Sequence, residues 1–166
     1  GLAGANIASA KQVFETWAHP FHSLHVLSDL HAACLGAHDG ESGAAIIIGT
    51  GSSGTVWYNH AFHDVGGHGF PIGDKARGAW LGLKAVKHTL LCLDELAPID
   101  ALATQICSAL KTNDINDIVS QCATFNTHHY AALVEQMLPL LYTKDETVSA
   151  LFEEGAAYIE SMAQRL

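Results

Sequence analysis

The sequence lacks the short signatures that mark many metalloproteins. None of its 4 cysteines forms a C-x-x-C pair, and H-E-x-x-H is absent although the chain has 11 histidines. These absences give no indication of a zinc site or an iron–sulfur cluster, so the predicted set of metal ligands is empty. The cysteines lie in apolar surroundings and are interpreted as free thiols of a reducing cytosol. They are Cys34, Cys92, Cys107 and Cys122.

Long apolar runs and positive charge are also scarce. No apolar segment approaches the roughly 20 residues that span a bilayer, and residues 1–6 do not resemble a signal peptide. The formal net charge of −9 argues against nucleic acid or an anionic membrane surface as a partner. It leaves room for a small anion held by backbone N–H groups, or for a cationic amine. We expect a globular, cytoplasmic protein, since 49% of its 166 residues are hydrophobic.

The residues that carry chemistry are concentrated between positions 28 and 74. An alternating run over 24–27 predicts a strand, which leads into Asp29 and an Ala- and Leu-rich helix over 30–37. Asp29 fits two roles. It is a favourable N-cap that accepts a backbone N–H, and it is also a carboxylate able to face a cleft at the carboxyl edge of a sheet.

A glycine-rich turn, G-T-G-S-S-G, follows the continuous apolar run over 44–48, which predicts a strand buried on both faces. Small residues and successive N–H groups allow this turn to bind an anion. The alternative is a plain hairpin turn, because T-V-W-Y over 55–58 is typical of a return strand. The turn is not a P-loop, since no G-K-[ST] follows it.

A second glycine-rich loop, V-G-G-H-G-F-P-I-G-D, follows a third predicted strand over 62–65, which completes an antiparallel meander. The loop ends at Asp74, which is either the N-cap of a predicted helix over 75–93 or a second carboxylate of a phosphoryl-transfer site. That helix carries an apolar stripe expected in the core. The stripe consists of Trp80, Leu83, Val86, Leu90 and Leu93.

Helices are predicted for most of the remaining chain. One covers 9–18, and others run from Pro98 through 110, from Asn113 or Asp114 through 123, over 128–142 with an interruption near Pro139, and from Asp145 onward. We therefore expect one domain over 1–166, with an α/β part over 1–93 and a helical part over 94–166. Both ends read as if the chain were a fragment of a longer protein.

Several of these motifs together resemble the bacterial glucosamine kinases. This family lies close to the N-acetylglucosamine kinases and the BadF/BadG-type ATPases, within the actin–hexokinase–Hsp70 superfamily. The matching segments are L-A-G-A, A-H-P-F, S-D-L-H-A-A-C-L-G-A-H, G-T-G-S and V-G-G-H-G-F-P-I-G-D. The resemblance covers nearly the whole chain. It implies an RNase H-like (actin-like ATPase) α/β fold with a mixed sheet, flanking helices and a helical C-terminal half.

The resemblance also implies an activity, the ATP- and Mg²⁺-dependent phosphorylation of the 6-hydroxyl of glucosamine in amino sugar metabolism. Asp29 matches the family's catalytic base. The positions that match its phosphate-binding turn are Gly49, Thr50, Gly51 and Ser52. The positions that match its sugar-binding residues are Thr50, Gly67, His68 and Asp74.

Two departures from the family pattern bear on function. The Asp-Gly-Gly-Gly-Thr hairpin that clamps phosphate and the later segment that holds adenosine are both missing, so this chain alone is expected to be inactive. His68 stands where animal N-acetylglucosamine kinases carry tryptophan, which favours the free amine. The alternatives are an N-acetylglucosamine kinase and a non-catalytic sugar-sensing or activase-type ATPase module. The expected partners are an amino sugar and ATP, without nucleic acid or membrane, and a homodimer stays open.

Overall fold

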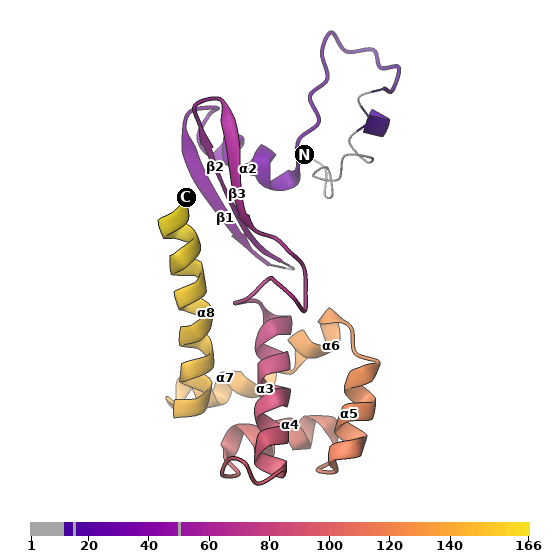
Figure 1. The fold of residues 1–166 in the computed structure, drawn as a ribbon, viewed down its shortest axis with the longest axis vertical. Helices are drawn as coiled ribbons and strands as arrows, with labels where there is room; N and C mark the ends of the chain where they lie inside the picture. The colour runs from indigo at the N-terminus through magenta and orange to yellow at the C-terminus, as the bar shows by residue number, and fades with distance from the viewer. Residues whose placement is uncertain (1–11, 15, 50) are drawn as a thin grey trace. The chain divides into compact units, whose positions relative to one another are not determined.

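The computed structural model describes residues 12–14, 16–49 and 51–166 (Figure 1). The described chain divides into two compact units. The sheet unit consists of the described residues up to 47, residues 53–67 and residues 162–166. The helical unit consists of residues 48–52 and 68–161. The predicted helix over 9–18 falls partly outside the described residues, of which 12–14 are helical.

Three strands form the sheet, in the order β1-β2-β3. They are β1 (Gly43–Ile48), β2 (Ser52–Tyr58) and β3 (Ala61–Gly66). Strand β2 pairs with β3 in antiparallel register, with Thr55 opposite Asp64. The turn between them consists of two residues with positive φ, Asn59 and His60, the pattern of a type I′ hairpin. The predicted meander is confirmed.

The predicted burial of β1 on both faces is wrong. Ile47 is 40% exposed and Ile48 is 52% exposed. The apolar run specified the strand because β-branched residues favour extended backbone. Burial depends instead on which elements cover the sheet, and a continuous apolar run does not encode that.

Helix α2 (Asp29–Ala37) lies in the sheet unit (Figure 1). Its N-cap is Ser28, whose hydroxyl accepts the N–H of His31 at 3.1 Å, so Asp29 is the first helical residue and not the cap. The prediction of a strand over 24–27 is wrong: these residues are irregular and pair with none of the three described strands. Leu30 and Cys34 are the buried residues of α2.

The other helices belong to the helical unit, apart from the last residues of the final one. They are α3 (Gly78–Leu93), α4 (Ala101–Leu110), α5 (Ile115–Ala123), α6 (Thr127–Ala132), α7 (Val134–Tyr142) and α8 (Glu146–Arg165). Side-chain oxygens accept N–H groups at the starts of four of them. These caps are Asp100, Asp114, Asn126 and Asp145.

Three predicted helix boundaries differ from the structure. Helix α3 begins at Gly78 and not at 75, because the preceding residues include left-handed positions. Helix α4 begins after its cap Asp100 and not at Pro98. The segment over 128–142 breaks at Leu133, between α6 and α7, whereas Pro139 lies inside α7. Proline is the sixth residue of this 9-residue helix, so it removes one backbone N–H from the hydrogen bonds of α7 without ending the helix.

One apolar cluster fills the interior of the helical unit, and the predicted stripe of α3 contributes to it. Trp80 and Val86 are buried, and Leu83, Leu90 and Leu93 pack against the cluster at partial exposure. Its buried members are Ala79, Trp80, Leu81, Ala85, Val86, Leu102, Ile106, Leu110, Ile118, Tyr130, Leu133, Met137 and Val148. All of them belong to the helical unit, so this unit holds the main hydrophobic core.

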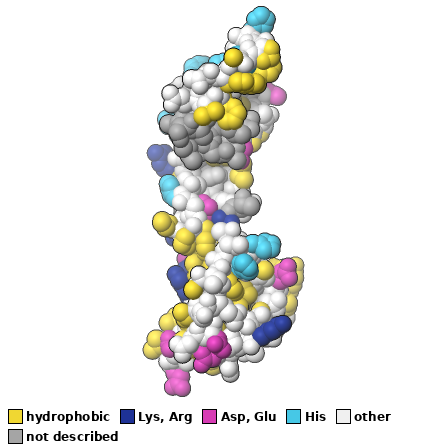
Figure 2. All heavy atoms as spheres, turned by 90° about the vertical axis from the view of Figure 1, so that its right-hand side faces the viewer, with side chains coloured by type: hydrophobic (Ala, Val, Ile, Leu, Met, Phe, Trp, Pro, Cys, Tyr) yellow, Lys and Arg dark blue, Asp and Glu magenta, His cyan; other side chains and the backbone are white. Residues whose placement is uncertain are grey.

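Figure 2 shows that the lysine and arginine side chains on one face of the molecule are scattered and do not gather into a patch. Acidic and histidine side chains stand among them. No described helix is both long and apolar enough to cross a membrane.

Candidate functional site

Asp29, the predicted base, is exposed at the first turn of α2. Its Oδ1 accepts the N–H of Leu30 at 3.0 Å. The free N–H groups and the dipole at a helix start stabilise a negative charge. The side chain is open to solvent, which suits a group that must meet a substrate.

His31, two residues further on, belongs to a polar trio that the sequence analysis missed. Its Nε2 lies 2.8 Å from Oδ1 of Asp64 on β3, and the Thr55 hydroxyl donates to the same oxygen at 2.6 Å. The imidazole ring stacks on Phe62 at 3.8 Å between ring centroids. Burial raises the pKa of Asp64, but the bonds from Thr55 and His31 and the histidine charges outweigh it and hold that pKa below its ordinary value. The trio thus joins the helix of Asp29 to the sheet.

The glycine turn between β1 and β2 is tight, as the hairpin alternative requires. The N–H of Gly49 donates to the carbonyl of Gly51 at 2.8 Å. The hydroxyl of Ser52 is buried and has no hydrogen-bond partner among the described residues. Such a group is costly to bury unless a ligand or water completes it. Thr50 lies outside the described residues.

Asp74 lies directly beside this turn. A Cβ built on Gly51 would sit 3.2 Å from Oδ2 of Asp74, so a larger residue in the turn would require the carboxylate to shift by a few tenths of an ångström. Asp74 is 5% exposed. It accepts the N–H of Gly69 and a guanidinium N–H of Arg77, each at 3.3 Å. The N-cap position of α3 belongs to Arg77, so Asp74 is not the cap of that helix.

The rest of the second glycine-rich loop folds back on itself. The N–H of Gly73 donates to the carbonyl of Gly69 at 2.6 Å. A Cβ at Gly73 would lie 2.7 Å from Cβ of His68, which is itself exposed. Gly67 has φ 73° and packs against Ser53 of the sheet unit. His68 and Asp74 thus stand at the two ends of one closed loop.

The structure joins some of the predicted site residues within one unit. Gly49, Gly51 and Ser52 of the turn belong to the helical unit together with His68 and Asp74. Asp29 and Gly67 belong to the sheet unit. That Asp29 and Asp74 serve one crevice stays a prediction.

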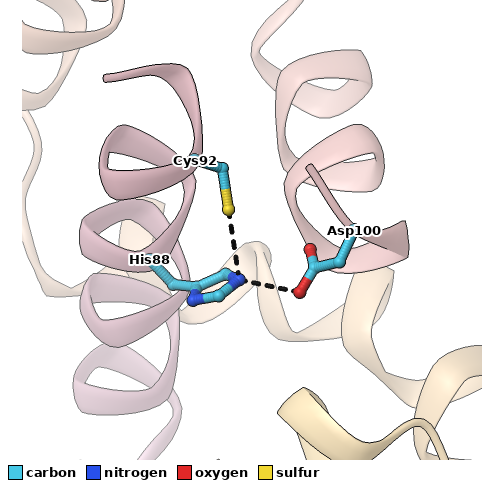
Figure 3. Close-up of side chains that lie close together, drawn as sticks. All are labelled: His88, Cys92 and Asp100. Carbon is cyan, nitrogen blue, oxygen red and sulfur yellow. Dashed lines mark hydrogen bonds and ion pairs between the residues drawn. The ribbon is translucent and has the colours of Figure 1, made fainter. Parts of the chain in front are cut away.

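A second polar cluster, also missed from the sequence, lies within the helical unit and is drawn in Figure 3. It consists of His88 and Cys92 on α3 and of Asp100 before α4. Burial is the main cause that raises the pKa of the Cys92 thiol, and the charge of Asp100 adds to it. The H-x-x-x-C spacing on a predicted helix was the available signal, because residues four apart share one face.

Comparison with known proteins places the chain beside bacterial kinases of amino sugars. No family model matches it. A crystal structure of a provisionally named N-acetylglucosamine kinase from Chromobacterium violaceum has a TM-score of 0.82 and 28% identity, over 99% of this chain and 57% of that one. One from Porphyromonas gingivalis, also provisionally named N-acetylglucosamine kinase, has a TM-score of 0.65 and 20% identity, over 92% and 54%, and supports the fold alone.

Among curated proteins the chain is similar to glucosamine kinase GspK of Vibrio cholerae serotype O1. The two are 36% identical over 159 residues, which is 96% of this chain and 54% of the relative. The resemblance to glucosamine kinases that the motifs indicated is confirmed. The chain spans about half the length of the relatives it matches.

Proposed function

We propose that the protein containing this chain is an ATP-dependent sugar kinase that phosphorylates the 6-hydroxyl of glucosamine in the cytoplasm. The similarity to a glucosamine kinase supports the reaction class. The observation that carries the proposal in this structure is the contact of the Asp74 carboxylate with Gly51. It brings a group able to hold sugar hydroxyls against a turn able to meet phosphate, and sugar phosphorylation requires both.

Asp29 acts as the general base in this proposal. Its carboxylate takes the proton of the 6-hydroxyl while that oxygen forms a bond to the γ-phosphorus of ATP. The bond from the γ-phosphorus to the bridging oxygen breaks, and ADP leaves. The exposed position of Asp29 at a helix start supports this role, because a substrate can reach its carboxylate.

The turn Gly49, Thr50, Gly51 and Ser52 meets the phosphates of ATP, which binds as a substrate in its Mg²⁺ complex. Phosphoryl transfer depends on positioning and on stabilising charge more than on covalent chemistry. The unpartnered hydroxyl of Ser52 supports this role, because a bound phosphate oxygen would accept its hydrogen bond.

The second loop holds the amino sugar. Asp74 accepts hydrogen bonds from ring hydroxyls, and charge-assisted bonds of this kind are shorter and stronger than neutral ones. Arg77 fixes the orientation of that carboxylate through its own bond. Gly67, His68 and Thr50 contribute the remaining contacts. His68 replaces the tryptophan that animal N-acetylglucosamine kinases carry at this position, which favours a sugar with a free amine.

The fold assigned to the intact enzyme is the RNase H-like, actin-like ATPase fold. Residues 1–93 form its α/β part and residues 94–166 a helical part. The phosphate-clamp hairpin and the adenosine segment are supplied by other parts of the longer protein. The share of the relatives' length that this chain spans, 54% and 57%, supports such a division.

The test is a phosphorylation assay on the full-length protein with MgATP and two sugars, glucosamine and N-acetylglucosamine. We expect turnover with glucosamine at a kcat/KM at least about tenfold higher than with N-acetylglucosamine, which corresponds to roughly 1.4 kcal/mol. The similarity to structures named N-acetylglucosamine kinase makes the reverse preference the second candidate. Binding of sugar and nucleotide without turnover would instead support a sugar-sensing or activase-type module.

A further inference from the structure

The cluster of His88, Cys92 and Asp100 lies outside the residues assigned to sugar phosphorylation. Oδ2 of Asp100 lies 2.7 Å from Nε2 of His88, and Sγ of Cys92 lies 3.4 Å from the same nitrogen. All three potential ligand atoms lie within 4.8 Å of one another. Figure 3 shows the imidazole between the thiol of its own helix and the carboxylate of the neighbouring segment.

This geometry is not that of a Cys-His-Asp nucleophile. In such a triad the nucleophile and the carboxylate meet opposite nitrogens of the imidazole, so that one nitrogen takes the proton of the nucleophile while the carboxylate orients the ring through the other. Here both meet Nε2. The Cys92 thiol is also 1% exposed, so it offers no substrate a path to sulfur.

A hydrogen-bond network also leaves part of the arrangement unexplained. Nε2 carries at most one hydrogen, and the short contact to Asp100 uses it. The thiol of Cys92 donates to the carbonyl of Pro98 at 3.2 Å. The 3.4 Å contact of the sulfur with Nε2 is therefore a second, longer contact of a nitrogen that already bonds Asp100, whereas a cation between the three atoms would interact with each of them.

The distances suit a small tetrahedral ion. Zinc bonds of ~2.0–2.1 Å to nitrogen or oxygen and ~2.3 Å to sulfur imply ligand separations of about 3.3–3.6 Å. The contact between sulfur and Nε2, at 3.4 Å, already falls in that range. The contact between Nε2 and Asp100 would need to open by roughly half an ångström. A thiolate and an imidazole select zinc over magnesium, which prefers oxygen ligands.

A second shell is in place around the carboxylate. Oδ2 of Asp100 accepts the Thr147 hydroxyl at 2.9 Å, and Oδ1 accepts the N–H of Ala103 at 2.8 Å. Such partners fix the orientation of a metal-binding carboxylate. The side chains of His88 and Asp100 are 23% and 24% exposed, so an ion and one water can reach them.

We propose that His88, Cys92 and Asp100 bind one Zn²⁺ ion through Nε2, Sγ and Oδ2, with water as the fourth ligand. On binding, the thiol becomes a thiolate and releases its proton to solvent, and the imidazole changes tautomer, so that its hydrogen stands on Nδ1 and the lone pair of Nε2 is free for the ion. The ion links the last turns of α3 to the start of α4, so its role is structural. Nothing in this role depends on the proposed kinase activity.

The test measures zinc in the full-length protein after treatment with a chelator and titration with Zn²⁺. We expect Cys92→Ala and His88→Gln each to lose one equivalent of zinc, or to bind it at least about 100-fold more weakly than the wild-type protein. Asp100→Asn keeps an oxygen that can cap α4 but loses the charge, so it should weaken binding without unfolding that helix.

Two matched controls separate this site from chance thiol or imidazole binding. Cys107→Ala removes a half-buried cysteine of α4 outside the cluster. His31→Gln removes a histidine that pairs with an aspartate and has no described thiol beside it. Both should keep the full zinc equivalent.

Cobalt provides a readout that does not depend on any variant folding. Co²⁺ added to the wild-type protein should give the near-ultraviolet absorption of a cobalt–thiolate bond, and zinc should remove it. The melting temperature should rise with Zn²⁺ and not with equal Mg²⁺. Equal zinc content in wild-type, Cys92→Ala and His88→Gln proteins, or cobalt binding without the thiolate absorption, would overturn the proposal.

Discussion

The two units contain the same polar trio in different surroundings. In the sheet unit, His31 and the Thr55 hydroxyl both meet Asp64. In the helical unit, His88 and Thr147 both meet Asp100. The first aspartate is 53% exposed and the second is 24% exposed.

The second trio differs in one further respect, since a buried cysteine approaches the histidine nitrogen that already meets the aspartate. The first histidine stacks on a phenylalanine ring. The same pair of side chains therefore fastens a helix to a sheet in one unit, and in the other it completes a set of metal ligands. The difference between the two histidine–aspartate pairs therefore lies in the side chain next to the histidine, which is a phenylalanine in one unit and a cysteine in the other.

The units also differ in how their interiors are built. The main apolar cluster lies in the helical unit, which contains Asp74. The sheet unit contains Asp29 on a short helix with two buried residues. The carboxylate proposed to hold the sugar thus belongs to the heavily packed unit, and the carboxylate proposed as the base belongs to the lightly packed one.

The largest effect is expected from Asp29→Asn in the full-length protein. Turnover should fall at least about a hundredfold, because a general base typically contributes 10²–10⁴-fold. The melting temperature should stay unchanged, since the side chain is exposed and Ser28 provides the cap. Steady-state kinetics with MgATP and glucosamine measures this.

The matched control is Asp39→Asn, which changes an exposed acid of the same unit with φ 50°. Asparagine tolerates this left-handed conformation. Turnover of that variant should equal the wild type. If Asp29→Asn also retains full turnover, Asp29 has no part in the reaction.

The next effect is expected from Asp74→Asn. Its ion pair with Arg77 has side-chain exposures of 8% and 9%, and removal of one partner of a buried pair costs about 3–5 kcal/mol. We expect a lower unfolding midpoint in denaturant together with weaker sugar binding.

The double variant Asp74→Asn with Arg77→Met separates the two consequences. It removes the unpaired guanidinium, so much of the stability should return while sugar binding stays weak. Calorimetric titration with glucosamine measures the binding. Normal sugar affinity in a folded double variant would remove Asp74 from the sugar site.

A smaller effect on stability is expected when one glycine in a helix of each unit is replaced by alanine. A Cβ at Gly82 of α3 would collide with the backbone carbonyl of Tyr130 in α6. Gly82→Ala should therefore lower the free energy of unfolding by about 1–3 kcal/mol. Gly36 of α2 has no atom within 4 Å of the corresponding position. Gly36→Ala should therefore stabilise by roughly 0.4–1 kcal/mol. Equal effects at the two sites would contradict the difference in packing.

The smallest effect concerns pH. The pKa of Asp64 is held below its ordinary value of 3.8, so its stabilising contribution is present above that value and is lost as pH falls through the lower, folded pKa. Asp64→Asn should therefore lower stability near neutral pH and flatten the fall in melting temperature below about pH 4. Thermal melts across this range compare it with Asp39→Asn. If Asp64→Asn leaves the dependence of melting temperature on acid pH unchanged, the titration of Asp64 does not contribute to stability.

The local patterns predicted much of the fold. The meander, α2, α5, and the apolar stripe of α3 follow from periodicity and turn residues. The strand over 24–27 and the two-sided burial of β1 were wrong because pairing and coverage come from other parts of the structure. The caps shifted because the N-cap of α2 is Ser28, one residue before Asp29, and the N-cap of α3 is Arg77, three residues after Asp74.

In the candidate site, too, some features could be predicted from local sequence patterns and others could not. The glycine turns and Asp29 were visible as motifs, and the D-x-x-R spacing was an available signal for the ion pair of Asp74 with Arg77. Asp64 and His31, in contrast, are 33 residues apart, and no short pattern encodes such neighbours.

The sequence by itself determined the succession of helices, strands and glycine turns, because these depend on neighbours within a few residues. Its motifs also determined the likeness to amino sugar kinases. Only the tertiary structure decided that Gly51 meets Asp74, and that His88, Cys92 and Asp100 converge on one point. The reason is that side-chain packing between helices and loops fixes these distances, and packing is a property of the folded chain as a whole.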